Sequence, residues 1–256
     1  LTSLHHPVPP LTSLSESLGN LSALTSLNLR GTPLDSLPES LGNLSALTSL
    51  YLSRTQISEL PASILPILAE YGIQLSQDSY GEGVHLNQVP LTSIPLKAYS
   101  LLEEDELAAL ARSVFHTSNV QLPLQIVDTL ISRQPDHASF YSQKALYAIY
   151  AKEYAMGISA AEKALSLAPD SISAYAPMAL AYLLSDQYEE AKQIYEKWMD
   201  STFSIVDRHG SVKTKLMKET FTKDLDRLEK FNIIHPDVEK IRALLDEEIE
   251  VAVEEE

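Results

Sequence analysis

The side chains that could carry out catalysis are sparse, and their spacing matches no catalytic motif. None of the seven histidines falls in a His-Glu-x-x-His pattern, and neither a phosphate-binding glycine loop nor a nucleophile-elbow serine occurs. The chain has no cysteine, which excludes thiolate nucleophiles, disulfides and Cys-ligated metals. The adjacent His5 and His6 lack nearby carboxylates, which favours a surface or cap role over a metal site. We therefore expect a protein that is not an enzyme and that holds no cofactor or metal.

The charge of the chain restricts its partners. The formal net charge is −16, and an acidic chain repels phosphate groups, so we expect neither nucleic acid nor a membrane surface as partner. The run from Glu103 to Glu106 suits the start of a helix, where the macrodipole favours carboxylates, and a cation site is the alternative. The acidic residues from Asp246 to Glu256 indicate a solvated helix end, with binding of a basic partner as the alternative.

Composition also bears on the compartment. Hydrophobic residues make up 45% of the chain, which suits one or two domains with an apolar core. No apolar run is long enough to cross a bilayer, and no signal peptide is recognisable. The lack of cysteine fits a reducing cytoplasm, so we predict a cytoplasmic location. The chain begins at Leu1, inside a repeat, which indicates a fragment of a longer protein.

A repeat of 23 residues organises the first part of the chain. The tetrapeptide Leu-Thr-Ser-Leu begins at Leu1, Leu24 and Leu47, and Ser-Leu-Gly-Asn-Leu-Ser-Ala recurs at residues 17–23 and 40–46. A unit of this size cannot bury its leucines alone, so successive units must stack to form a continuous core.

The pattern inside one unit predicts its local structure. Leu27 and Leu29 alternate as they would in a short strand that has one buried face. After Pro61 the pattern stops, and residues 64–71 are predicted to form a helix that ends at Gly72.

These motifs resemble the leucine-rich repeat, and the Leu-Pro-x-x-Leu-Gly-x-Leu phrasing is similar to its intracellular, Ras-group type. Thr32 and Thr55 stand where the family has the asparagine that bonds neighbouring turns, and a threonine hydroxyl replaces that bonding only in part. The resemblance implies an α/β solenoid with a short parallel sheet, whose concave face binds partners; an ordinary solvated sheet surface is the alternative. Arg30 and Tyr51 are of the residue types most enriched in binding hot spots. The candidate protein-binding residues on this face are Ser26, Asn28, Arg30, Ser49, Tyr51 and Ser53.

A second repeat, of 34 residues, begins at residue 104. Pro135 and Pro169 lie 34 residues apart and divide this part into units 104–137, 138–171 and 172–205. A small residue at the eighth position lets the two helices of a pair approach closely. In the three units this residue is Ala111, Ala145 and Ala179.

These units resemble the tetratricopeptide repeat, most closely at 138–171 and 172–205, although Trp198 stands where the family has alanine. The resemblance implies an all-α array of helical hairpins whose groove binds an extended peptide or a partner helix. The family's clamp for a terminal carboxylate is absent, because only Arg112 has a suitable charge. Either a hydrophobic partner or the chain's own C-terminal helices fill the apolar groove, and the second is favoured because an exposed apolar groove is a liability. The candidate groove residues are Arg112, Phe115, Leu146, Ile149, Leu180 and Leu183.

The segments outside the two arrays are predicted to be ordered as well. The connector is too apolar for a free linker, although a flexible tether is the alternative. After residue 205 a polar turn leads into a helix near residues 214–230, and Pro236 begins another helix. The predicted domains are leucine-rich repeats at 1–72, an ordered connector at 73–103, helical repeats of tetratricopeptide type at 104–205, and C-terminal capping helices with an acidic tail at 206–256.

The predicted function is that of a non-catalytic scaffold, of bacterial origin, that binds a protein or peptide through the concave surface of either array. The alternative is the recognition arm of a larger signalling or effector enzyme. Its catalytic domain would lie outside these residues, because leucine-rich repeats of this kind accompany GTPase and ubiquitin-ligase domains in some families.

Overall fold

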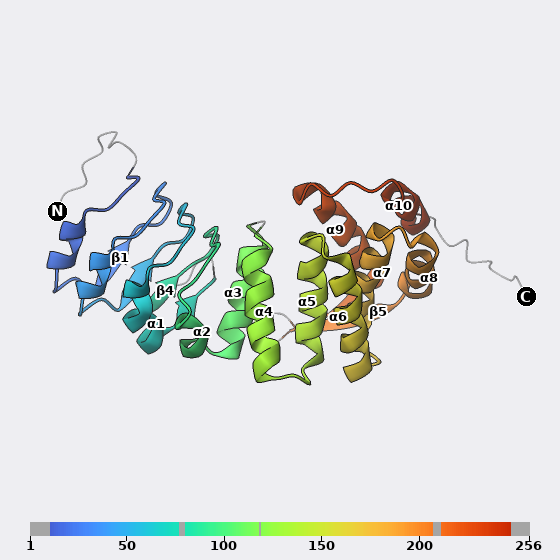
Figure 1. Cartoon of the computed structure of the whole chain (residues 1–256), viewed down its shortest axis with the longest axis horizontal. Coiled ribbons are helices and arrows are strands. Elements are labelled where there is room, and N and C mark those ends of the chain that lie inside the picture. The colour runs from blue at the N-terminus through green and yellow to red at the C-terminus, as the bar shows by residue number, and fades with distance from the viewer. Residues whose placement is uncertain (1–10, 77–79, 118, 207–210, 247–256) are drawn as a thin grey trace, which may run out of the picture. The chain divides into compact units, whose positions relative to one another are not determined.

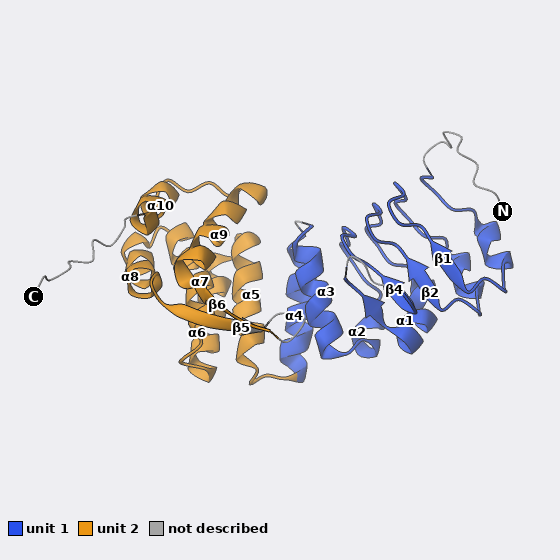
Figure 2. Ribbon diagram, turned by 180° about the vertical axis from the view of Figure 1, so that it is seen from behind, with its two compact units in different colours: residues 1–133 blue, residues 134–256 orange. Residues whose placement is uncertain are grey.

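The computed structural model describes residues 11–76, 80–117, 119–206 and 211–246. The chain divides into two compact units, unit 1 at Leu1–Arg133 and unit 2 at Gln134–Glu256 (Figure 1; Figure 2). The division falls inside the range 104–205, so the first predicted helical pair belongs to the same unit as the leucine-rich part. Each unit is described on its own.

Unit 1 begins with stacked turns in which a short strand alternates with a short helix (Figure 1). The pairing of β1 with β2 is parallel and joins Ser26 to Ser49 and Leu27 to Leu50, so neighbouring strands lie one 23-residue period apart, which confirms the predicted repeat. The first elements are η1 (Glu16–Asn20), β1 (Ser26–Asn28), η2 (Glu39–Asn43), β2 (Ser49–Tyr51), η3 (Ala62–Ile64), α1 (Leu65–Tyr71), β3 (Ile73–Gln74) and β4 (Gly83–His85).

The stacked turns continue past Pro61, so the prediction that the pattern stops there is wrong. Strand β4 pairs in parallel with β2, and its Gly83 lies opposite Ser49, 34 residues earlier. The further turn is 11 residues longer than the 23-residue period (34 − 23), and the extra residues hid it from a search at fixed spacing. Strand β3 occupies the far edge of the sheet, whose order is β1-β2-β4-β3. The residues that fill the leucine positions of this further turn are Val84, Leu86, Leu91 and Ile94, all of them buried.

The threonines at the asparagine position bond within their own turn. Thr32 Oγ1 donates to the carbonyl of Leu29 at 2.7 Å, and Thr55 Oγ1 donates to that of Leu52 at 2.8 Å. Contact between neighbouring turns relies instead on the backbone, where the amide of Gln56 donates to a carbonyl of the preceding turn at 2.8 Å.

Close stacking on the helical side of the turns explains the glycine of the repeated Ser-Leu-Gly-Asn phrase. A Cβ atom added to Gly19 would lie 2.6 Å from the carbonyl oxygen of Ser40 and 2.8 Å from its Cβ. The equivalent Gly42 faces Ser63 in the next turn, with 3.1 Å between an added Cβ and the serine Cβ. A side chain at either position would push two turns apart.

We expect Gly19→Ala to lower the free energy of unfolding of unit 1 by about 1–3 kcal/mol, the usual range for overpacking. The clash involves backbone that cannot rotate away. Hydrogen exchange of the β1 and β2 amides measures this loss, and Ser22→Ala, a change at an exposed position, is the matched control. Equal protection in the two variants would show that the turns separate at no cost.

A group of helices completes unit 1 after the sheet. These are α2 (Ala98–Leu101), α3 (Glu104–Phe115) and α4 (Gln121–Arg133). Glu103 and Glu106 form a capping box at the start of α3, as expected for a carboxylate run at a helix start. The other oxygen of Glu106 accepts the backbone amide of Ile73 at 2.9 Å, which ties α3 to the β3 edge. At the end of α4, Arg133 donates to the carbonyls of Leu102 and Tyr99, which the end of α2 leaves open.

Unit 2 contains two helical hairpins followed by a strand pair and two further helices (Figure 1). Ala145 and Ala179 are fully buried where paired helices pack, as the 34-residue pattern predicts. Gly157 serves the same close approach, because a Cβ there would lie 3.0 Å from Ile149. The elements are α5 (Ala138–Tyr150), α6 (Tyr154–Leu167), η4 (Ile172–Ala174), α7 (Tyr175–Leu184), α8 (Tyr188–Trp198), β5 (Thr202–Val206), β6 (Val212–Leu216), α9 (Met217–Lys230) and α10 (Val238–Asp246).

The antiparallel pair of β5 and β6 was not predicted. Residues 214–216, assigned from the sequence to the next helix, form the end of β6, and α9 begins only at Met217. The alternation Val-Lys-Thr-Lys-Leu has the two-residue period of a strand, and it decides the local structure ahead of the helical stripe that follows it.

Candidate functional site

An arginine between two tyrosine rings is the main feature of the strand face of unit 1. The guanidinium carbon of Arg30 lies 4.4 Å from the ring centre of Tyr51 and 4.9 Å from that of Tyr80. Tyr51 in turn stacks on His85, with 4.1 Å between the ring centres. We call these four residues the tyrosine–arginine cluster. They come from the ends of β1, β2 and β4 and from the segment between β3 and β4, so distant parts of the sequence meet here.

The long connection into β4 holds this cluster in place. The hydroxyl of Tyr51 and both backbone polar groups of Gly81 lie within hydrogen-bond distance, at 3.1 Å. His85 Nε2 also lies 3.0 Å from the Gly81 carbonyl oxygen, which requires the proton to be on Nε2. Burial lowers the pKa of His85, the bond to Gly81 raises it in part, and Arg30 lowers it further. Tyr51 is therefore half-covered, whereas Tyr80 is 79% exposed.

The predicted residues of this face are not equally accessible. Ser26 and Asn28 are exposed, and Arg30 is half-buried by the rings beside it. Ser49 and Ser53 are buried, so the prediction that they offer a binding surface is wrong. The further turn around β4 covers them, and the Ser53 hydroxyl faces the carbonyl of His85 at 3.5 Å.

Most of the predicted groove residues are core residues. Arg112 is exposed on α3, but Phe115 on the same helix is buried. Ile149, Leu180 and Leu183 are fully buried in unit 2, so they form no open binding surface, and their assignment as contact residues is wrong. Leu146 alone among the unit 2 candidates keeps partial exposure.

Helix α9 covers the groove side of the hairpins, which is the alternative that the sequence favours. The Tyr150 hydroxyl on α5 donates to the backbone carbonyl of Asp224 on α9 at 2.9 Å. Tyr195 on α8 meets Phe221 edge to face with 4.7 Å between the ring centres, and α9 also contacts α7. The carboxylate of Asp224 is buried here and pairs with Arg227 at 2.6 Å. Burial raises the pKa of Asp224 to about 6, although Arg227 opposes the shift.

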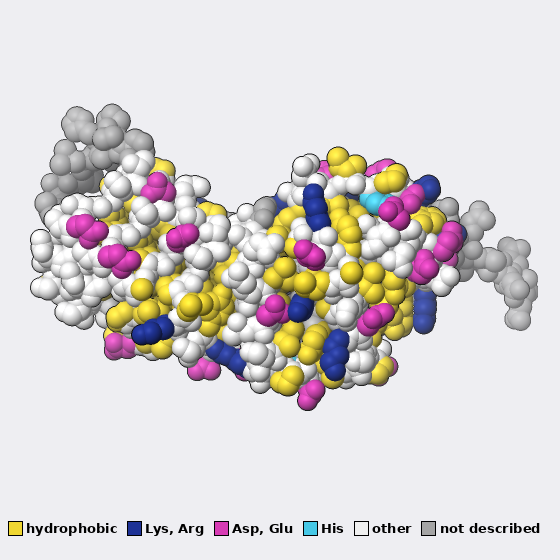
Figure 3. All heavy atoms as spheres, viewed as in Figure 1, with side chains coloured by type: hydrophobic (Ala, Val, Ile, Leu, Met, Phe, Trp, Pro, Cys, Tyr) yellow, Lys and Arg dark blue, Asp and Glu magenta, His cyan; other side chains and the backbone are white. Residues whose placement is uncertain are grey.

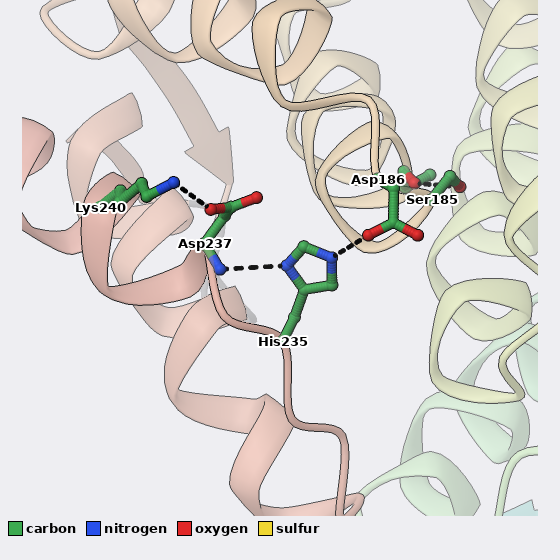
Figure 4. Close-up of polar contacts among 6 residues, drawn as sticks. Ser185, Asp186, His235, Asp237 and Lys240 are labelled. Atoms are coloured by element: carbon green, nitrogen blue, oxygen red, sulfur yellow. Dashed lines mark hydrogen bonds and ion pairs between the residues drawn. The ribbon is translucent and has the colours of Figure 1, made fainter.

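A histidine–aspartate contact in unit 2 looks at first like part of a catalytic group (Figure 4). His235 Nε2 lies 3.1 Å from the carboxylate of Asp186, and the backbone amide of Asp237 donates to its Nδ1 at 3.3 Å. Both ring nitrogens are thus engaged. The neighbouring Ser185 hydroxyl donates to the Ala181 carbonyl at 2.6 Å. The arrangement joins the loop after α7 to the start of α10 and leaves no nitrogen to activate a nucleophile.

The described residues also bear on metal and membrane binding. Within the described ranges, no group of three or more His, Asp or Glu residues could hold a metal ion. His5 and His6 lie outside those ranges. No helix in the described part of the chain is both long and apolar enough to span a bilayer. On the face drawn in Figure 3, charged side chains of both signs are interspersed with hydrophobic ones over unit 2.

Comparison with known proteins supports the first repeat. A family model described as Leucine Rich Repeat matches residues 23–44. A chain from the structure titled "Crystal structure of MamA protein" is similar at 17% sequence identity with a TM-score of 0.35, and the match covers 54% of this chain. It covers 66% of that chain, just under two thirds of its length, and a similarity at this level carries no argument about fold or function. No curated protein matches the sequence.

Proposed function

We propose that the chain is a non-catalytic scaffold that binds a protein partner through the strand face of unit 1. The observation that supports this is the tyrosine–arginine cluster, in which Arg30 lies across the rings of Tyr51 and Tyr80. Arginine and tyrosine dominate binding hot spots because both bury a large area with little loss of side-chain freedom. The match of residues 23–44 to the leucine-rich repeat fits this role, since such repeats commonly mediate protein interaction.

The surface proposed for contact is smaller than the sequence alone suggests. It consists of Ser26, Asn28 and Arg30 at the β1 end together with Tyr80, because the connection into β4 half-covers Tyr51. Unit 2 and the helical end of unit 1 are proposed to be arrays of tetratricopeptide type. The bacterial origin, the cytoplasmic location and the domain bounds drawn from the sequence remain part of the proposal.

Binding to a display library of random peptides tests this function, because the library supplies ligands whatever the natural partner is. Peptides selected on the full chain are expected to bind the Arg30→Ala and Tyr80→Ala variants at least about tenfold more weakly, the effect of losing a modest hot spot. The matched control is Lys97→Ala, an exposed cation of the same unit outside the patch. Peptides that bind all four proteins equally, with circular dichroism unchanged, would assign recognition to another surface.

A further inference from the structure

Helix α9 leaves one part of the unit 2 groove open, as a pocket of about 290 Å³. Its apolar side is formed by Leu146 on α5 with Ala176 and Pro177 on α7. This volume lies at the lower end of the range of about 300–1,000 Å³ for ligand pockets, which suits an inserted side chain better than a large cofactor. The remaining lining is polar and comes from Ser139, Ser142, Gln143, Ser173, Thr220, Asp224 and Arg227.

One polar atom of this lining lacks a partner among the described residues. Gln143 Oε1 is buried and accepts no hydrogen bond from them, although Gln143 as a whole is only half-buried. A buried acceptor without a donor is unfavourable, and the terminal amide of glutamine turns easily about its last torsion. A ligand with an N–H group in the pocket would therefore remove an existing cost.

A donor lies at the α9 side of the same pocket. Arg227 carries five N–H donors, and Nη1 donates to Asp224 Oδ1 at 2.6 Å. The Arg227 side chain is 35% exposed, so its guanidinium is within reach of a group that enters from solvent. The pair of Asp224 and Arg227 carries no net charge, so the pocket favours a neutral dipolar ligand over an ion.

We infer that this pocket binds the carboxamide side chain of a glutamine or asparagine in a peptide partner. A carboxamide has both groups that the pocket complements, because its NH₂ donates to Gln143 Oε1 and its C=O accepts from Arg227. Its methylene groups cover Leu146 and Ala176. A carboxylate would meet the Asp224 charge, an ammonium would meet Arg227, and an apolar side chain would leave Gln143 unsatisfied. The inference concerns unit 2 alone and does not depend on the strand face of unit 1.

A titration of the full chain with N-acetylglutamine methylamide, followed by nuclear magnetic resonance, tests the inference. We expect saturable shifts of the Arg227 Nε–H signal, with a Kd on the order of 1 mM for a ligand of this size. The same titration with the capped glutamate and capped leucine analogues at pH 7.5 should give binding at least about tenfold weaker. Equal affinity for glutamate, or no saturable shift with glutamine up to 20-fold above that Kd, overturns the inference.

The Gln143→Met variant isolates the unpartnered acceptor. Methionine keeps the length of the side chain and removes the acceptor, so the glutamine analogue should bind at least about tenfold more weakly. The matched control is Gln193→Met, on an exposed position of α8, which should bind as the unaltered chain does. Fluorescence of Trp198, the single tryptophan, reports whether unit 2 stays folded. The comparison of the three analogues on the unaltered chain decides the question even where a variant fails to fold.

Discussion

Replacing Leu180 by glutamate is expected to unfold unit 2 rather than to weaken binding of a partner. Leu180 lies on α7 at 0% exposure, in the packing between the hairpins and α9. A carboxylate there has no partner, and placing an unpaired charge in a core costs about 4 kcal/mol or more, a large part of the 5–15 kcal/mol that holds a domain folded. The expected result is loss of the native Trp198 signal, because Trp198 stacks on Tyr175 within the same unit.

The matched control for this change is Ile234→Glu. Ile234 belongs to the same unit but is 92% exposed, so a charge at this position remains in water and unit 2 should stay folded. Urea unfolding followed by Trp198 fluorescence compares the two variants directly. A folded Leu180→Glu chain that loses only peptide binding would mean that α9 leaves the groove in solution, and the groove residues predicted from the sequence would then be contact residues.

The parts of unit 1 that could be predicted are those with strict spacing. The leucines of the 23-residue period identify the first strands and their register, since each leucine needs the same neighbour in the next turn. The turn around β4 follows the same chemistry, with Leu86 and Leu91 in the places of Leu52 and Ile57, but the 11-residue insertion shifts it out of period. A search that allowed one insertion would have found it, and with it the burial of Ser49 and Ser53.

The candidate site could be predicted only in part. Arg30 and Tyr51 follow from their strand positions, but the part played by Tyr80 depends on how the insertion folds back, which no local pattern encodes. In unit 2 the helical stripe of α9 predicts a packing face without indicating what it packs on. The contact of Asp224 with α5 joins residues 74 positions apart, and its acidic side chain gives no sign in the sequence that it is buried.

Replacing Asp224 by asparagine should change the pH dependence of stability in a direction opposite to that of an ordinary ion pair. Burial raises the pKa of Asp224 from 3.8 to about 6, so the folded state binds the proton more tightly than the unfolded state. Stability from this group is fully present below pH 3.8 and is lost as the pH rises through 6. At 1.36 kcal/mol per pKa unit, the shift of roughly two units corresponds to about 3 kcal/mol.

The Asp224→Asn variant removes this titration, and asparagine can still accept the hydrogen bond from Arg227. The groups that face the carboxylate are Arg227 and Lys223 on its own helix and the hydroxyls of Tyr150 and Tyr195, whose pKa values burial holds above their usual range. We therefore expect the free energy of unfolding of the variant to rise relative to the unaltered chain between pH 4 and pH 8. About 1.4 kcal/mol of this gain falls above pH 5, clear of the isoelectric point near 4.8, where the acidic chain is least soluble.

Urea unfolding monitored by Trp198 fluorescence at pH 5, 6, 7 and 8 measures this difference, and Asp170→Asn, at an exposed position of the same unit, is the control that should show no such slope. The sign of the slope is informative about α9. A variant that becomes less stable relative to the unaltered chain as the pH rises would mean that the attraction of Arg227 outweighs the desolvation of Asp224. The carboxylate would then be in contact with water, and α9 would lie less deeply in the groove than the burial of Asp224 and Phe221 indicates.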